Sequence, residues 1–243
     1  MHETGTRTHW RALSSDPNAA AVRAELVETL RSRRGPRIPD TEQFLRDFVR
    51  GHSTLDVGVV EHVVSASTCS HWKHRIVVEN ASHVLGVDIL ADAVGELSAR
   101  GFNVRTCDAT SDVDLGERFE RIHVGDVIEH VDAPVALLRF CRRHVTADGL
   151  ILVATPNPMF FPQLVEALKN EMFIPNAEHV AWISPTMALE LAHRAGLRLV
   201  TYHHTQGDGK TFKRRIAVQV LKAFGLRENE LFSGCFYYVF APA

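Results

Sequence analysis

The sequence predicts an α/β fold in which a parallel sheet carries helices on both faces. Three observations support this prediction. Short apolar segments alternate with helical segments, Gly and Pro separate them, and acidic residues follow several of the apolar segments. A chain of this order runs its strands parallel through right-handed crossovers. The carboxyl ends of the strands then share one edge of the sheet, where ligands bind in such folds.

Two helices are expected before the sheet. Residues 19–31 are rich in Ala, Glu, Leu and Arg, which favour helix. Residues 41–50 follow Asp40, a residue type that caps helices, and repeat apolar side chains at helical spacing. We therefore expect residues 1–50 to form a helical segment that caps or covers the domain formed by residues 51–243.

The rest of the chain alternates between strands and helices. Asp148 and Gly149 are expected to form a turn before the fifth strand. The strands are predicted at residues 54–60, 83–87, 102–107, 121–127, 150–155, 197–203 and 235–240, and the helices between them at residues 69–81, 90–100, 135–145 and 185–195.

A basic helical insertion is expected at about residues 207–234. Its cations, among them Lys213 and Arg214, are interleaved with apolar residues such as Phe212 and Ile216. This pattern fits a solvated amphipathic helix packed on the sheet. The alternative is a cover that meets an anionic substrate, for instance the pyrophosphate of a nucleotide-activated sugar.

Composition excludes several other classes of protein. The net charge of -2 does not favour nucleic acid as a partner. No two of the four Cys are spaced as a zinc-binding pair, so we expect reduced thiols. The longest apolar runs are too short to span a membrane, and the first residues are polar. These features lead us to expect a cytoplasmic protein without a membrane span.

Three predicted strand ends carry residues suited to adenosine. The first reads Leu55-Asp56-Val57-Gly58, and a glycine there lets backbone N–H groups approach a ligand. The second ends at Asp88, whose carboxylate can accept from both hydroxyls of a ribose or can cap the next helix. The third ends at Asp108, which is placed either to accept from an adenine amino group or to cap the following turn.

Three further segments resemble a known family. Residues 124–131 read VGDVIEHV, residues 148–157 read DGLILVATPN, and residues 179–185 read HVAWISP. The first is similar to the segment that follows the fourth strand in class I S-adenosylmethionine-dependent methyltransferases, the second to the family's fifth strand, and the third to the segment before its sixth. The resemblance covers about residues 40 to 205.

The resemblance implies a fold, a cofactor and a set of contacts. The fold is a Rossmann-like, seven-stranded mixed sheet whose seventh strand is antiparallel, with helices on both faces. The cofactor is S-adenosylmethionine. Gly58, Asp88, Asp108 and Gly125 match positions that contact the cofactor in the family. With their neighbours, the expected cofactor-binding residues are Asp56, Gly58, Val60, Asp88, Ile89, Asp108, Ala109, Gly125 and Asp126.

The first glycine motif departs from the family's pattern. The usual form is D-x-G-x-G-x-G, whereas this chain has Val60 and His62 at two glycine positions. Their side chains crowd the methionine end of the cofactor unless the loop is reshaped. Two interpretations stay open: a reshaped loop that binds, or a catalytically inactive, methyltransferase-like binding protein. A nucleotide-cofactor oxidoreductase is a further alternative, but it requires a G-x-G-x-x-G motif that is absent.

Two histidines are candidates for general base. Residues Glu129 and His130 follow the fourth strand, and His179 lies on the segment expected to cover the substrate. His130 or His179 is placed to take the proton of a substrate hydroxyl; a purely structural role is the alternative. We expect O-methylation of a hydroxyl on a sugar or small natural product, and a homodimer is possible. The sequence reveals no compact cluster of carboxylates and histidines, so no metal is predicted.

Overall fold

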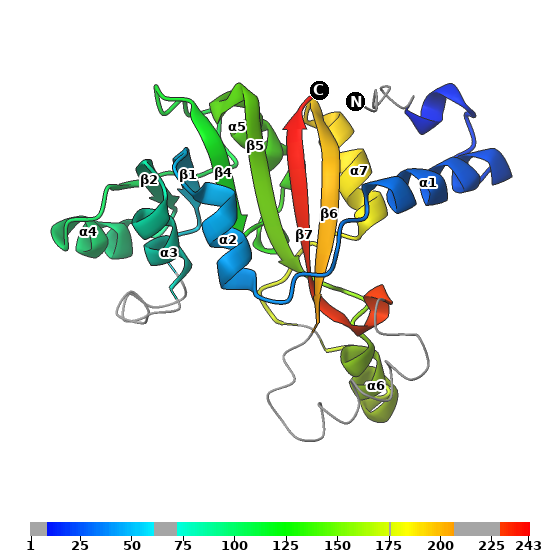
Figure 1. Cartoon of the computed structure of the whole chain (residues 1–243). Coiled ribbons are helices and arrows are strands. Elements are labelled where there is room, and N and C mark those ends of the chain that lie inside the picture. Colours follow the sequence, from blue (N-terminus) through cyan, green and yellow to red (C-terminus); the bar gives the residue numbers. More distant parts are fainter. Residues whose placement is uncertain (1–8, 61–71, 175, 207–228) are drawn as a thin grey trace.

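One seven-stranded sheet organises the chain. The computed structural model describes residues 9–60, 72–174, 176–206 and 229–243. The strand order is β3-β2-β1-β4-β5-β7-β6, and β7 pairs antiparallel with β5 and β6 while the other neighbouring strands pair parallel (Figure 1). The predicted mixed sheet is confirmed. The strands are β1 (Ser53–Val57), β2 (His83–Asp88), β3 (Val104–Thr106), β4 (Phe119–Gly125), β5 (Val145–Pro156), β6 (Leu197–Gln206) and β7 (Ser233–Pro242).

The predicted helices are present, with ends that shift by a few residues. Of the helix expected at residues 69–81, residues 69–71 lie outside the described part of the chain. Helix α6 was not predicted. The helices are α1 (Ala20–Arg33), α2 (Thr41–Val49), α3 (Lys73–Asn80), α4 (Ala91–Ala99), α5 (Pro134–His144), α6 (Phe161–Asn170) and α7 (Pro185–Arg194), and the 3-10 turns are η1 (Trp10–Ala12), η3 (Ile128–His130) and η4 (Glu230–Phe232).

Helices cover both faces of the sheet, as neighbouring residues of β5 demonstrate. Leu152 packs into a cluster with residues of α2 and α3. Ile151 and Val153 belong instead to the larger cluster with residues of α5 and α7. Because successive side chains of a strand point to opposite faces, the two clusters lie on opposite sides of the sheet.

The turn expected at Asp148 and Gly149 is wrong. Strand β5 begins at Val145 and continues through both residues to Pro156. Its pairing with β4 is irregular there, because Phe119 faces Val145 while Arg121 faces Leu150. A Cβ on Gly149 would lie 2.6 Å from a methyl carbon of Val145. The turn-forming pair therefore makes a bulge within the strand rather than a boundary before it.

The N-terminal segment is joined to the β6 edge. Helix α1 contacts β6 and α7 (Figure 1). The linker after α1 forms parallel bridges from Arg34 to Tyr202 and from Ile38 to Thr205. Helix α2 then crosses to the face that carries α3. The boundary at residue 50 and the role as a cap stay predictions.

Most of the predicted basic insertion, residues 207–228, lies outside the described residues. Its expected last residues, Ser233 and Gly234, belong to β7 instead of a helix. Within the described ranges, no helix is both long enough and apolar enough to cross a bilayer.

Candidate active site

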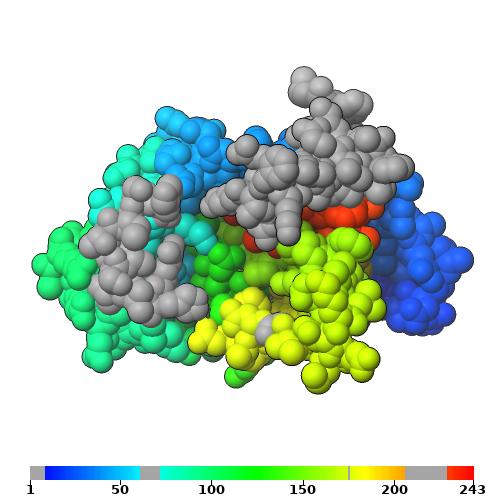
Figure 2. All heavy atoms as spheres, turned by 90° about the horizontal axis from the view of Figure 1, so that it is seen from below, coloured from blue at the N-terminus to red at the C-terminus, as the bar shows by residue number. Residues whose placement is uncertain are grey.

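The parallel strands β1, β2, β4 and β5 end at one edge, which lies at the bottom of Figure 1 and faces the viewer in Figure 2. Most of the predicted site residues stand at or just beyond these ends. They form two groups. One surrounds the ends of β1 and β2, and the other surrounds η3 and the segment before α7.

Gly58 ends the first strand in a conformation that suits glycine. Its φ is +81°, and an added Cβ would lie 2.2 Å from Cγ2 of Val127. Its N–H donates to the carbonyl of Val87 at 2.9 Å, which fixes the turn against β2. The position therefore excludes side chains on both conformational and steric grounds.

Asp56 is buried beneath this turn between two imidazoles. Nδ1 of His123 lies 2.7 Å from one carboxylate oxygen, and Nδ1 of His74 lies 2.8 Å from the other. Burial raises the pKa of Asp56, but the two histidines outweigh it and hold the pKa well below its usual range. Asp56 fixes β1 to β4 and α3, and both its oxygens are engaged within the protein.

Asp88 closes the loop that carries the altered glycine motif. Its Oδ2 accepts from the N–H of Val60 at 2.9 Å, and its Oδ1 accepts from the N–H of Leu90 at 3.1 Å. The side chain of Val60 is half-buried against a cluster that includes Trp72 and residues of α4. His62 lies outside the described residues. Ile89, next to Asp88, is 65% exposed at this edge.

Asp108 lies beyond β3 as the cap of a turn. Its Oδ1 accepts from the N–H of Thr110 at 2.8 Å and from the Thr110 hydroxyl at 2.6 Å. These hydrogen bonds lower the pKa of Asp108. Asp108 therefore caps this turn, as one of the two interpretations predicts. Its carboxylate is exposed, and the neighbouring Ala109 is half-buried.

Gly125 and Asp126 end β4. A Cβ on Gly125 would lie 2.7 Å from the ring of His123. Asp126 has a φ of 55°, in the left-handed region, and its N–H donates to the carbonyl of Ala154 at 3.1 Å. Its carboxylate forms an ion pair with Nζ of Lys73. Lys73 was not predicted, because nothing in the sequence pairs α3 with the end of β4.

Glu129 lies in η3, just past Asp126, and is 2% exposed. Its Oε2 accepts from the hydroxyl of Thr155 at 3.0 Å, whereas its Oε1 is buried without a hydrogen-bond partner in the described structure. Burial raises the pKa of Glu129 to about 7, and the nearby charge of Asp126 acts in the same direction.

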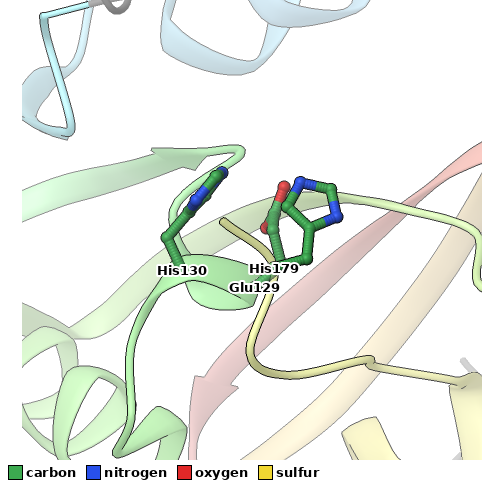
Figure 3. Close-up of side chains that lie close together, drawn as sticks. All are labelled: Glu129, His130 and His179. Carbon is green, nitrogen blue, oxygen red and sulfur yellow. The ribbon is translucent and has the colours of Figure 1, made fainter. Parts of the chain in front are cut away.

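The two candidate bases face each other beside Glu129 (Figure 3). The rings of His130 and His179 meet edge to face, with centroids 4.8 Å apart. The backbone brings His179 there, because the N–H groups of Val180 and Ala181 both donate to the carbonyl of Glu129, at 2.9 and 3.1 Å. Burial, and then the charge of His130, lowers the pKa of His179.

A cavity that is partly open to solvent lies beside this group. The hollowed face is seen in Figure 2, where α6 and the segment before α7 border it. Its walls combine hydrogen-bonding and aromatic groups. They include Glu129, Thr155, Asn157, Gln163, His179 and Trp182.

The seven-stranded sheet with antiparallel β7, together with these strand-end residues, defines a class I S-adenosylmethionine-dependent methyltransferase. A profile of the methyltransferase domain family matches residues 23–202, and the chain belongs to that family. Its methyl donor is S-adenosylmethionine.

Individual proteins are similar over much of their length. A ubiquinone biosynthesis O-methyltransferase of Neisseria meningitidis serogroup C is 26% identical over 173 residues, which cover 64% of this chain and 69% of the relative. The crystal structure of a SAM-dependent methyltransferase from Archaeoglobus fulgidus has a TM-score of 0.54 at 16% identity, covering 90% of this chain and 98% of the other. The crystal structure of a SAM-dependent methyltransferase from Mesorhizobium loti has a TM-score of 0.50 at 16% identity, covering 82% of this chain and 95% of the other.

The strand-end residues fit this donor. At Gly58 and Gly125 a Cβ would collide with the side chains of Val127 and His123, so the packing of the protein itself requires glycine at both strand ends. The carboxylate of Asp88 keeps lone pairs beyond its two hydrogen bonds, as a ribose diol requires. Ile89 beside it is apolar and exposed.

Proposed function

We propose that this methyltransferase acts on a hydroxyl oxygen of a small molecule, a sugar or natural product. The observation that carries the proposal is the pair of imidazoles, His130 and His179, beside a cavity at the cofactor edge. The relative named as an O-methyltransferase supports oxygen as the accepting atom. The mixed polar and aromatic walls support an acceptor that carries both hydroxyls and carbon surface.

The residues proposed to hold the donor are those at the ends of β1, β2, β3 and β4. When bound, S-adenosylmethionine supplies an activated methyl group, whose bond to sulfur breaks as the new bond to oxygen forms. The protein must then align the acceptor and exclude water from the cavity. Such alignment can lower a barrier by about 7–11 kcal/mol in favourable systems. The cofactor-binding set remains Asp56, Gly58, Val60, Asp88, Ile89, Asp108, Ala109, Gly125 and Asp126.

One histidine is proposed to accept the proton that the acceptor loses. As the oxygen–carbon bond forms, the O–H bond breaks and the proton passes to an unprotonated ring nitrogen of His130 or His179. His179 lines the cavity, whereas His130 is not among its lining residues and contacts the ring of His179 edge to face. This favours His179 as the residue that meets the acceptor.

Alanine variants test the base. We expect His179→Ala to slow single-turnover methyl transfer by about 100-fold, and His130→Ala by about tenfold, since general bases contribute roughly 10²–10⁴-fold. The matched control is His83→Ala, because His83 is exposed at the opposite end of β2 and pairs there with Glu117. Unchanged rates in both site variants would reject the assignment.

A catalytically inactive binding protein is the second candidate. It is favoured by one observation, that Val60 and His62 stand at two positions where the family's first motif has glycine. Calorimetry with S-adenosylhomocysteine separates the candidates. An inactive protein that lost the cofactor gives no heat at about millimolar ligand, whereas an active one gives a dissociation constant in the micromolar range.

A further inference from the structure

Three side chains of metal-ligand type converge next to the cavity. Glu129, His130 and His179 each offer a ligand atom, and these atoms all lie within 4.8 Å of one another (Figure 3). Two of them are neighbours in sequence, and the third arrives on a separate segment held to the Glu129 carbonyl by two backbone hydrogen bonds. The fold, not the sequence spacing, makes the cluster.

The carboxylate in this cluster is half satisfied. Oε2 of Glu129 accepts from the Thr155 hydroxyl, which fixes the plane of the carboxylate. Oε1 is buried and has no hydrogen-bond partner within the described ranges. A buried carboxylate oxygen without a partner is costly, and such oxygens are normally paired or coordinate a metal. A cation beside Oε1 would remove this cost.

The donor set indicates the kind of cation. Two imidazoles and one carboxylate, with positions left open, form the ligand set of catalytic zinc sites and related transition-metal sites. Magnesium and calcium prefer sets made of oxygen alone. The second carboxylate nearby, Asp126, adds negative charge but is paired with Lys73.

We propose that Glu129, His130 and His179 bind one divalent transition-metal ion of the zinc class, with an open position toward the cavity. Ligands about 2.1 Å from a tetrahedral ion lie about 3.4 Å apart. Since the ligand atoms lie within 4.8 Å of one another, binding draws them together by at most about 1.4 Å, which side-chain rotation supplies.

The open position would allow the ion to bind the acceptor hydroxyl of the proposed reaction. This role of the ion rests on the proposed function. An acceptor hydroxyl bound there becomes more acidic, because the ion stabilises the oxyanion. Held by Glu129, His130 and His179, the ion would lower the pKa of that hydroxyl, and its proton would leave to solvent as the methyl group is transferred to the oxygen. In the metal-loaded protein the imidazoles are ligands, and the base role proposed above belongs to the metal-free protein.

Metal binding is tested without the reaction. Chelator-treated protein is titrated with Co²⁺ and followed by its visible absorption, and Zn²⁺ then competes in calorimetry. We expect one ion per chain, a dissociation constant for Zn²⁺ below about 10 µM, and no heat with Mg²⁺. Glu129→Gln and His179→Ala should each weaken Zn²⁺ binding by at least about tenfold.

His83→Ala is again the matched control and should bind like the wild type. Absence of binding, or equal binding by His179→Ala and wild type, overturns the proposal. Thermal unfolding and S-adenosylhomocysteine binding establish that each variant is folded; if Glu129→Gln does not fold, His179→Ala decides. If the wild type binds Zn²⁺ but transfers no methyl group, only the proposed function is contradicted. If it transfers a methyl group but binds no Zn²⁺, only the metal site is contradicted.

Discussion

Gly58 shows how one residue determines the conformation of the turn after β1. The position requires glycine for two separate reasons. Its backbone is left-handed, and an added Cβ would lie 2.2 Å from the side chain of Val127. The neighbouring atom belongs to a β-branched side chain, which is stiff about its first torsion and cannot easily move away. Substitution therefore has to shift the backbone between β1 and η3.

We expect Gly58→Ala to weaken S-adenosylhomocysteine binding by at least about tenfold in calorimetry, because the displaced turn belongs to the proposed donor site. Gly101→Ala is the matched control. Its φ is +89° but nothing lies within 4 Å of the added Cβ, so it bears only the conformational cost, about 1 kcal/mol of stability. Adding Val127→Ala to Gly58→Ala should recover part of the affinity. Full affinity in Gly58→Ala alone would contradict this account.

At the level of single residues, the sequence predicted positions better than roles. Asp88 and Gly125 stand at strand ends as expected, because parallel strands finish at a common edge. His179 was predicted through the family resemblance, and its contact with His130 carried no sequence signal. That contact depends on the hydrogen bonds from Val180 and Ala181 to the Glu129 carbonyl, which link segments about 50 residues apart. The same long-range link explains why the three-residue cluster was not predicted.

Among the elements, α7 holds the N-terminal turn through one carboxylate. Glu190 accepts from Nε1 of Trp10 at 3.0 Å and from Nε of Arg194 at 2.8 Å, and it lies 3.1 Å from Nε2 of His9. Burial raises the pKa of Glu190, but the hydrogen bonds from Trp10, Arg194 and His9 outweigh it and lower the pKa from 4.5 to about 2. A depressed carboxyl pKa stabilises the fold above the unfolded value and loses this effect as pH falls.

We expect Glu190→Gln to lower the free energy of unfolding by about 1 kcal/mol near pH 6, a value discounted for the partial exposure of the group. Less than about half of this difference should remain at pH 3. At that pH the Glu190 carboxyl is protonated in the unfolded chain, and it begins to be protonated in the folded protein as well. Urea unfolding at the two values of pH measures it. Glu166→Gln is the control, since Glu166 forms an exposed pair with Lys169. A difference independent of pH would contradict the assignment.

Two elements also mark the limits of prediction from sequence. Helix α6 begins with Pro162 in its first turn and buries none of its residues. A proline after two phenylalanines resembles an extended segment, so its role as a helix-starting residue was missed. The Asp148-Gly149 pair has the composition of a turn, yet the pairing of β5 with β4 on both sides absorbs it as a bulge.

Over the whole molecule, the sheet was the most predictable feature. Its central strands are apolar and buried on both faces, which gives short continuous runs such as Ile151 to Ala154. The antiparallel direction of β7 came only from the family resemblance, and its position between β5 and β6 was not predicted, since no local pattern states which strands are neighbours. The packing of α1 on the β6 edge likewise depends on distant residues.

The interior place of β7 has a consequence for how the protein is made. Residues 233–242 form the bridge through which β6 joins the sheet, and both their edges are paired. Until the ribosome has released them, β5 exposes an unpaired edge and residues 197–206 have no partner strand in the sheet. The sheet is therefore completed only after residues 233–242 have left the ribosome, and the edge of β5 stays unpaired until then.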